Sequence, residues 1–243
     1  MMNKQTLGMM GVAILVSATA TAAPVANLKI NGDIKPPTCT VNGGDQADLI
    51  YNLGAVSPSV IPQSTTYQSL PIVINKLTVE CDAATYLSFK ATDAYPNEFI
   101  LPPGMNRNFK ANAFTMVDSS DTSKTIGGVS YRWDRVTVDG ETAYISRAND
   151  APDDNKDYAY SMYMLKNATN AWTKIQQKYV DVSALELISG KVFTADISTN
   201  RELKHGNTLT YILPRDELDK QGVDISEGID YTSNTILTFN FGV

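Results

Sequence analysis

The chain has 243 residues, 20 of them basic and 26 acidic, and its net charge at neutral pH is -6. An acidic surface repels phosphate groups, so we expect no nucleic-acid partner. One histidine and two cysteines cannot supply the several His or Cys ligands of a zinc site, so we also expect no cofactor.

The first 22 residues have the pattern of a secretory signal peptide. Lys4 supplies the positive charge, residues 7–16 are apolar, and Ala20-Thr21-Ala22 fits the small-residue cleavage site. The apolar run is shorter than the roughly 20 residues that cross a bilayer. We therefore expect export, cleavage of residues 1–22, a mature domain over residues 23–243 and no transmembrane segment.

Alternating apolar and polar residues predict a first strand before the first cysteine. Its apolar positions are Leu28, Ile30, Gly32 and Ile34. Residues 72–81 and 87–91 predict two further strands, with a bulge near Asn75-Lys76 where the phase of the alternation changes. Cys39 and Cys81 both lie in strand-like segments of an exported chain, so we predict a disulfide between them.

Asp139-Gly140 is the clearest turn signal, because these residue types readily take the positive φ angles of a type I′ turn. It predicts a hairpin formed by residues 129–138 and 141–146. Residues 158–165 and 171–175 predict a second hairpin, for which a short helix is the open alternative.

The remaining elements are short. The late strands are predicted at residues 191–197, 208–213 and 235–243. Residues 183–188 favour a helix, and the stretches 95–108 and 147–157, rich in Pro or Asp, are predicted loops. Many short strands separated by turns indicate an all-β sandwich.

The closing strand places Leu237, Phe239 and Phe241 on one face, and no charged residue follows Thr232. A long neutral edge of this kind invites pairing with another chain. Alternation alone favours the other interpretation, an interior strand of a closed sandwich.

Catalytic and metal-binding patterns are weak. His205 is the only histidine and lies in a turn-like setting, and the serine-hydrolase motif G-x-S-x-G is absent. Asp153, Asn155 and Asp157 have the spacing of a calcium loop, but Tyr158 stands at the glycine position, so a solvated acidic loop is preferred. We expect no enzymatic activity.

Trp133, Trp172 and Tyr160 are candidates for a platform that stacks on a sugar. Flat aromatic rings beside carboxylates suit polyhydroxylated ligands. Half-buried strands also select aromatic residues, and this packing interpretation is preferred.

Residues 30–39, which run from Ile30 through Gly32 to Cys39, resemble the start of a chaperone–usher pilin domain. Cys81, followed by Asp82 and a new strand, resembles the same arrangement. Most of the mature chain is similar to a bacterial family of periplasmic, fimbria-associated proteins of undetermined function. The resemblance implies an immunoglobulin-like (pilin-like) β-sandwich with one disulfide, in which residues 95–178 are an enlarged central region.

The resemblance also implies a function. The protein would be a structural or accessory subunit of a fimbrium, in the periplasm or at the cell surface, that acts by strand-complementation assembly or adhesion. Its partners would be a periplasmic chaperone and sister fimbrial subunits. Leu237, Phe239 and Phe241 would contact the chaperone, and residues 28–34 would be a donor strand. The open alternative is a monomeric, self-complemented protein that binds a glycan.

Overall fold

The computed structural model describes residues 28–30, 34–151, 162–199 and 209–241. The chain divides into two units, residues 1–35 and residues 36–243, and each is described by itself. The predicted signal peptide lies outside the described residues.

In the first unit, Leu28, Ile30 and Ile34 are fully exposed and belong to no strand. Gly32 lies outside the described residues. The prediction of a first strand with a buried face is therefore wrong for the described part of this segment. A strand needs a neighbour to satisfy its backbone groups, and alternation alone does not supply one. The role of this segment as a donor strand stays a prediction.

The second unit is built mainly of strands, as the sequence predicts. They are β1 (Cys39–Val41), β2 (Ile74–Asp93), β3 (Phe114–Asp118), β4 (Thr125–Val129), β5 (Arg132–Val138), β6 (Glu141–Thr142), β7 (Tyr144–Arg147), β8 (Thr169–Thr173), β9 (Ser189–Ser198), β10 (Tyr211–Ile212), β11 (Tyr231–Thr232) and β12 (Thr235–Phe241). The helices are η1 (Pro58–Val60), η2 (Arg107–Ala111), η3 (Val182–Ala184) and α1 (Arg215–Lys220). Among the described residues, no helix is both long and apolar enough to cross a membrane.

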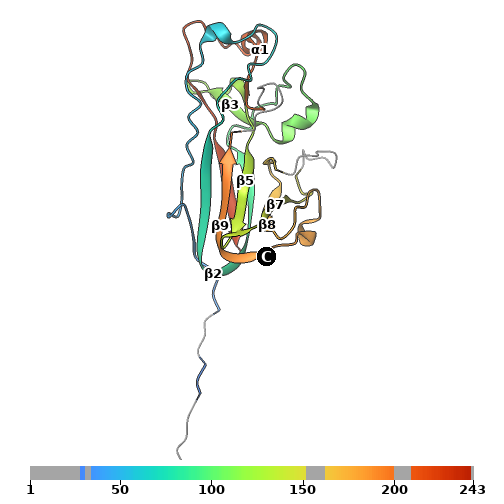
Figure 1. Ribbon diagram of the computed structural model, residues 1–243. Coiled ribbons are helices and arrows are strands. Elements are labelled where there is room, and N and C mark those ends of the chain that lie inside the picture. The colour runs from blue at the N-terminus through green and yellow to red at the C-terminus, as the bar shows by residue number, and fades with distance from the viewer. Residues whose placement is uncertain (1–27, 31–33, 152–161, 200–208, 242–243) are drawn as a thin grey trace, which may run out of the picture. The chain divides into compact units, whose positions relative to one another are not determined.

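The long strand β2 organises the main sheet and joins the two predicted strands around Cys81 and residues 87–91. Its first half pairs with β9 on one edge and β1 on the other, and its second half pairs with β12 and β8. The predicted bulge near Asn75-Lys76 is wrong, because the pairing with β9 is regular there. The register shifts instead between Glu80 and Thr85, where β2 curves (Figure 1). A strand that bends at an irregularity can take part in both layers of a sandwich.

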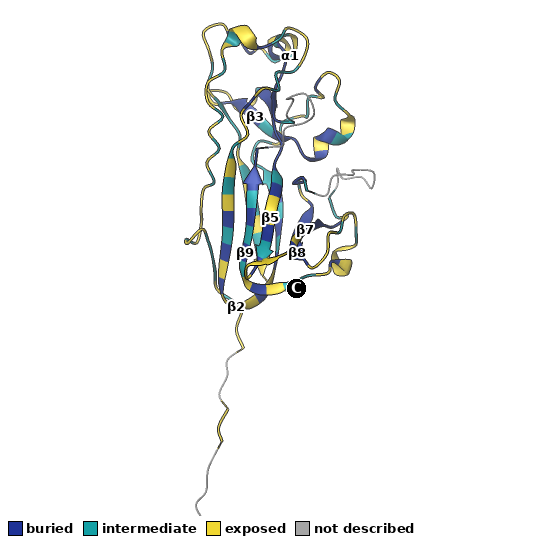
Figure 2. Ribbon diagram, viewed as in Figure 1, coloured by how far each residue is buried: buried dark blue, intermediate teal, exposed yellow. Residues whose placement is uncertain are grey.

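Ring contacts show that the two layers face each other. Trp172 of β8 packs against Phe193 of β9, with ring centroids 5.7 Å apart, and Phe89 of β2 packs against Trp133 of β5 at 6.3 Å. All four side chains are buried, and along β2 and β9 buried residues alternate with residues that are exposed or of intermediate burial (Figure 2). The predicted all-β sandwich is confirmed.

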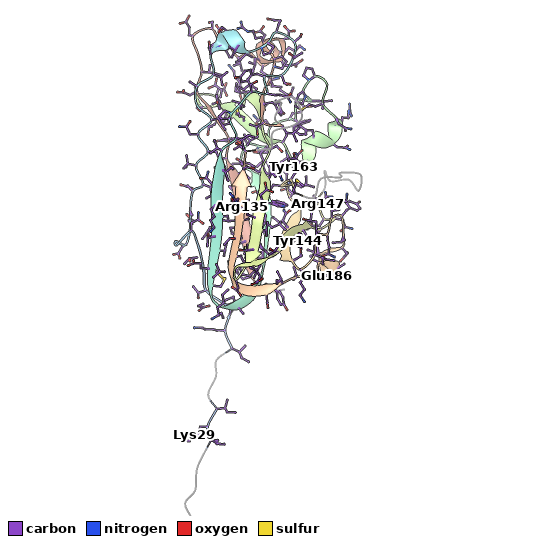
Figure 3. The ribbon with its side chains drawn as sticks, viewed as in Figure 1. Lys29, Arg135, Tyr144, Arg147, Tyr163 and Glu186 are labelled. Carbon is purple, nitrogen blue, oxygen red and sulfur yellow. A yellow bond between two sulfur atoms is a disulfide. The ribbon has the colours of Figure 1, made fainter. Side chains whose placement is uncertain are left out.

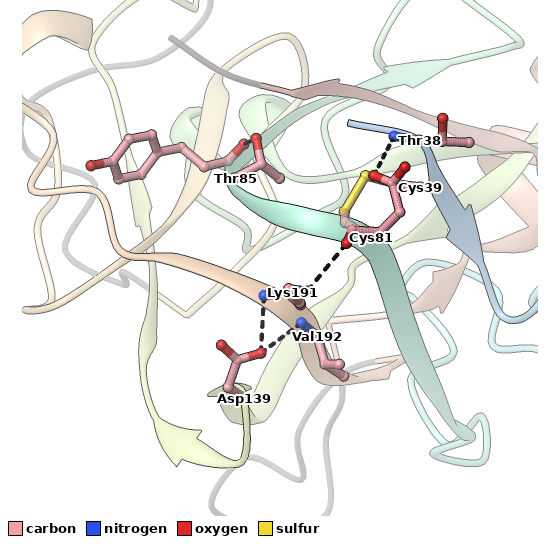
Figure 4. The surroundings of a disulfide bond; sticks show 9 residues. Thr38, Cys39, Cys81, Thr85, Asp139, Lys191 and Val192 are labelled. Carbon is pink, nitrogen blue, oxygen red and sulfur yellow. Dashed lines mark hydrogen bonds between the residues drawn. A yellow bond between two sulfur atoms is a disulfide. The ribbon is translucent and has the colours of Figure 1, made fainter. Parts of the chain in front are cut away.

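The predicted disulfide between Cys39 and Cys81 is present. The two cysteines lie directly opposite each other where β1 pairs with β2. The backbone N–H of Thr38 donates a hydrogen bond of 2.9 Å to the carboxylate of Asp82 beside the bridge (Figure 4). The short strand β1 is thus attached to β2 by a covalent bond as well as by backbone pairing.

The predicted turn at Asp139-Gly140 is confirmed, with φ angles of 51° and 86°. The Asp139 carboxylate also accepts hydrogen bonds from the N–H groups of Lys191 and Val192, which attaches the turn to β9 (Figure 4). The second arm of the predicted hairpin, residues 141–146, is not one continuous strand. It divides at Ala143, where β6 leaves β5 and β7 begins to pair with β8.

The predicted second hairpin is wrong. Strand β8 lies between β7 and β2, and residues 162–165 form neither a strand nor a helix. Tyr163 and Lys166 form isolated β-bridges to Arg132 and Ala91, outside the named strands. Residues 158–161 lie outside the described residues. Alternation identifies a strand but not its neighbour in the sheet, and here both neighbours are remote in sequence.

The late elements agree in part with the prediction. Strands β9 and β12 are confirmed, and β10 covers two residues of the predicted segment 208–213. The helix expected at residues 183–188 is only the turn η3, whereas α1 was not predicted. Residues 95–106 form no helix or strand, as predicted. Residues 148–151 of the second predicted loop form none either.

The enlarged central region contributes to two sheets. Its strands β5, β7 and β8 belong to the main sheet, and β3 and β4 form a smaller sheet with the later strands β10 and β11. In Figure 1 this smaller sheet lies toward the end of the unit that carries α1. Gly127 of β4 permits close pairing, because a Cβ atom there would lie 2.0 Å from the carbonyl oxygen of Tyr211.

Candidate functional site

The predicted sugar platform is not at the surface. Trp133 and Trp172 are buried, and the indole Nε1 of Trp172 donates a hydrogen bond of 3.3 Å to the carbonyl of Thr194. The prediction of a sugar-stacking platform is therefore wrong for these two residues, and the packing interpretation is confirmed. Tyr160 lies outside the described residues.

The other polar candidates fall in segments that are not described. His205 and the aspartates around Asn155 lie in residues 200–208 and 152–161. Among the residues that the structure does describe, no group of three or more His, Cys, Asp or Glu side chains could hold a metal ion.

A small hollow of about 310 Å³ lies on the outer side of β5 and β9. It contains Asp134, Asp196 and Arg135 (Arg135 is labelled in Figure 3), and Arg135 forms an ion pair with Asp196. Asp134 forms a second ion pair with Arg132. The charges in and beside the hollow are thus neutralised by ion pairs, so the hollow offers no unpaired carboxylate of Asp134 or Asp196 to a ligand.

Strand β12 is an edge strand among the described residues. It pairs there with β2 alone. The carbonyl of Asn234 accepts a hydrogen bond of 2.9 Å from the N–H of Ala94, so the backbone of Asn234 faces β2. Alternate residues of a strand direct their N–H and C=O groups to opposite edges. Leu237, Phe239 and Phe241 therefore direct theirs to the open edge.

The side chains of β12 are only partly covered. Leu237 and Phe239 are half-buried against the core, and the Phe239 ring lies 5.8 Å from that of Phe89. Phe241 is 40% exposed. The predicted inward row is confirmed for Leu237 and Phe239, which pack against the core, and wrong for Phe241, whose side chain is exposed.

A second unpaired segment, which we name the strap, consists of residues 47–56. Leu49, Tyr51 and Leu53 are half-buried and pack against the core, whereas Ile50 and Asn52 are exposed. This alternation is typical of a strand. In the described part of the chain, however, no backbone–backbone hydrogen bond joins the strap to another segment.

Side chains hold the strap in place. The hydroxyl of Tyr51 donates to the carbonyl of Ile197 at 3.1 Å, and the amide of Asn75 donates to the carbonyl of Ile50 at 2.8 Å. The hydroxyl of Tyr231 donates to the carbonyl of Gly54 at 3.1 Å. Burial raises the pKa of Tyr51, which keeps its hydroxyl protonated and able to donate. Side-chain hydrogen bonds, two of them to the carbonyls of Ile50 and Gly54, thus dock the strap, although its backbone pairs with no strand among the described residues.

A groove of about 1180 Å³ is lined by the strap, by β12 and by the chain that leads into β12. Apolar side chains of other strands form its floor. They are Leu77, Met116, Ile126, Val129 and Ile197. The groove therefore combines an apolar floor with two walls: the strap, which pairs with no strand among the described residues, and β12, one edge of which is open there. Such a site can accept an extended chain by strand addition.

The sequence indicated only one wall of this site. Leu237 and Phe239 were identified from the neutral closing strand, but the strap was not. The feature that could have identified the strap is the alternation of Leu49, Tyr51 and Leu53 with residues that are exposed in the structure.

A scan against protein-family models found no match, and a search of curated proteins found no match either.

Proposed function

We propose that this protein is an exported, fimbrial-type structural or accessory subunit with an immunoglobulin-like sandwich, which accepts an extended strand from a partner chain in the groove. The observation that carries this proposal is that the strap, which pairs with no strand among the described residues, and the open edge of β12 flank one apolar floor. A strand inserted there would find backbone partners and a place for its alternate side chains.

Physical chemistry supports strand insertion at this edge. An unpaired strand edge that also exposes apolar side chains is a template for another chain. Leu237 and Phe239 would complete their burial, and the backbone groups of the open edge would exchange water for protein partners. The partners on this proposal are a periplasmic chaperone and sister fimbrial subunits.

The proposal is tested with a photo-crosslinking residue, p-benzoylphenylalanine, at position 239 of the full chain in the cells that make it. Tyr144, which is 40% exposed and outside the groove, is the control position (Figure 3). We expect position 239 alone to crosslink to one extended segment with alternating apolar residues. In the purified complex, the amides of Leu237 and Phe239 should exchange about a hundredfold more slowly than in the free protein, because they gain hydrogen bonds.

Two results would contradict the proposal. One is equal crosslinking from positions 239 and 144. The other is a folded protein that crosslinks at position 239 only within its own chain, which would instead support the self-complemented monomer.

A further inference from the structure

Two tight turns of the second unit share one geometry. Asn42-Gly43 follows β1 and joins it to Gly44, and Asp139-Gly140 joins β5 to β6. The φ angles are 46° and 83° in the first turn and 51° and 86° in the second. Positive φ at both central residues is the mark of a type I′ turn, so the two turns have the same backbone form.

The first residue of each turn also pairs with a neighbouring strand. The backbone N–H of Asn42 donates to the carbonyl of Thr78 on β2 at 2.8 Å, and that of Asp139 donates to the carbonyl of Val192 on β9 at 2.7 Å. The side chain then accepts from the N–H of the same strand residue, at 2.7 Å from Thr78 and at 2.8 Å from Val192 (Figure 4 shows the bond to Asp139). Each side chain thus takes the place of a backbone carbonyl and holds its turn on that strand.

The two side chains differ in their second hydrogen bond. At Asp139 one oxygen, Oδ1, accepts both bonds. At Asn42 the oxygen Oδ1 accepts from Thr78, whereas the nitrogen Nδ2 donates to the carbonyl of Lys76 at 3.1 Å. An ionised carboxylate accepts hydrogen bonds but cannot donate one. Position 42 therefore requires an amide, whereas an amide or a carboxylate can make the bonds at position 139.

Asn42 is exposed and is followed by glycine. Asparagine loses its side-chain amide most readily before glycine, which has no side chain to shield its backbone nitrogen. In this reaction the nitrogen of Gly43 gives up its proton and bonds to Cγ of Asn42, which closes a succinimide ring, while Nδ2 leaves as ammonia. Water then opens the ring at either carbonyl and produces aspartate or isoaspartate.

We propose that Asn42 is a deamidation site that the fold keeps closed, and that it reacts only after the turn leaves β2. In the docked turn, Oδ1 and Nδ2 are both bonded to β2, and the side chain has to give up these bonds to reach the nitrogen of Gly43. The change prevents docking again, because aspartate places an acceptor against the carbonyl of Lys76 and isoaspartate lengthens the backbone of the turn. It also affects the groove, since Val41, beside the turn, lines it.

The rate of deamidation tests the protection. The purified full chain is incubated at mildly alkaline pH, either folded or in guanidinium chloride with its disulfide intact, and peptide mapping measures aspartate and isoaspartate at position 42. Asn31, which also precedes glycine and lies outside the described residues, is the reference for the unfolded rate. We expect Asn42 to react more than about tenfold more slowly in the folded chain, because the reaction waits for local opening. Equal rates for Asn42 in the folded and unfolded chain would overturn the proposal.

Loosening β1 tests the opening step. Cys39→Ser/Cys81→Ser removes the covalent attachment of β1 to β2. We expect it to accelerate deamidation of Asn42 by about the same factor as amide exchange of Thr78, because one opening of the turn releases both groups. Guanidinium chloride below the unfolding transition gives the same comparison on the natural chain. Faster exchange of Thr78 with an unchanged rate at Asn42 would overturn the link.

A matched pair of substitutions tests the need for an amide at position 42. Asn42→Asp should lower the thermal midpoint by about 4 °C, since it removes the donor to Lys76 and adds a repulsive acceptor. Asp139→Asn should lower it by only about 1 °C, because the amide oxygen can accept both bonds. It also creates a second Asn-Gly pair in the same geometry, which should be protected in the folded chain as Asn42 is. Equal losses for the two variants, or deamidation of folded Asp139→Asn at the unfolded rate, would contradict the proposal.

Discussion

Strands β9 and β12 offer a matched comparison, because both alternate apolar and polar residues and both pair antiparallel with β2. The inward-facing apolar residues of β9 are buried, with Phe193 and Ala195 at 0% exposure. The corresponding residues of β12 are not, since Leu237 and Phe239 are half-buried and Phe241 is exposed.

The difference follows from the number of neighbours. Strand β9 has β2 on one edge and β5 on the other, whereas β12 has only β2 in the described part of the structure. Alternation determines which face of a strand is apolar, but a second neighbour determines how completely that face is covered. An alternating strand that lacks this neighbour is therefore a candidate site for a partner.

The largest expected effect is the loss of unfolding free energy when an apolar residue of β9, rather than of β12, is replaced by aspartate. Phe193→Asp places an unpaired charge in the closed core, and we expect it to cost more than about 4 kcal/mol of unfolding free energy. Phe239→Asp should cost about half as much, because water reaches the groove. Asn240→Asp, on the exposed face of β12, should stay within about 0.5 kcal/mol. Denaturant unfolding measures all three, and equal losses for Phe193→Asp and Phe239→Asp would contradict the comparison.

The next effect concerns the disulfide, which attaches β1 to the edge of β2 opposite β9. Cys39→Ser/Cys81→Ser should lower stability by about 3–4 kcal/mol, since the bridge closes a loop over a sequence separation of 42. Val41 of β1 lines the groove. Hydrogen exchange should therefore accelerate first at Thr78 and Val41. Earlier loss of protection between β9 and β5 would show that the groove side is not the weaker one.

The smallest effect lies on the outer face of the sheet that holds β12. Asp150 accepts hydrogen bonds from Lys90 at 2.8 Å and from Thr169 at 2.8 and 2.7 Å. Burial raises the pKa of Asp150, but these bonds outweigh it and hold the pKa below its usual range. The resulting stability, about 1 kcal/mol, is fully present above the ordinary carboxyl pKa of about 3.9. It is lost as the pH falls through the lower folded-state pKa.

Asp150→Asn should therefore be less stable than the natural chain at pH 7, and the difference should shrink as the pH falls below about 4. Unfolding free energies measured from neutral to acidic pH check this. A difference that does not change with pH would show that the carboxylate charge contributes nothing.

Much of the fold was predictable because its signals are local. The Asp139-Gly140 turn, the alternation of β9 and β12 and the two strand-borne cysteines each identify an element from a few neighbouring residues. The failures share a different cause. The bend of β2, the partners of β8 and the helix α1 depend on segments far away in the sequence, and no local pattern identifies those segments.

The candidate site divides in the same way. The sequence by itself determined that the protein is built of alternating strands, that Cys39 and Cys81 are joined, and that the closing strand has an apolar face with Leu237 and Phe239. Only the tertiary structure decided that β12 has one neighbour among the described residues and that the strap lies against the core without backbone pairing. The physical reason is that side-chain alternation belongs to a single strand, whereas an open edge is a property of the whole sheet.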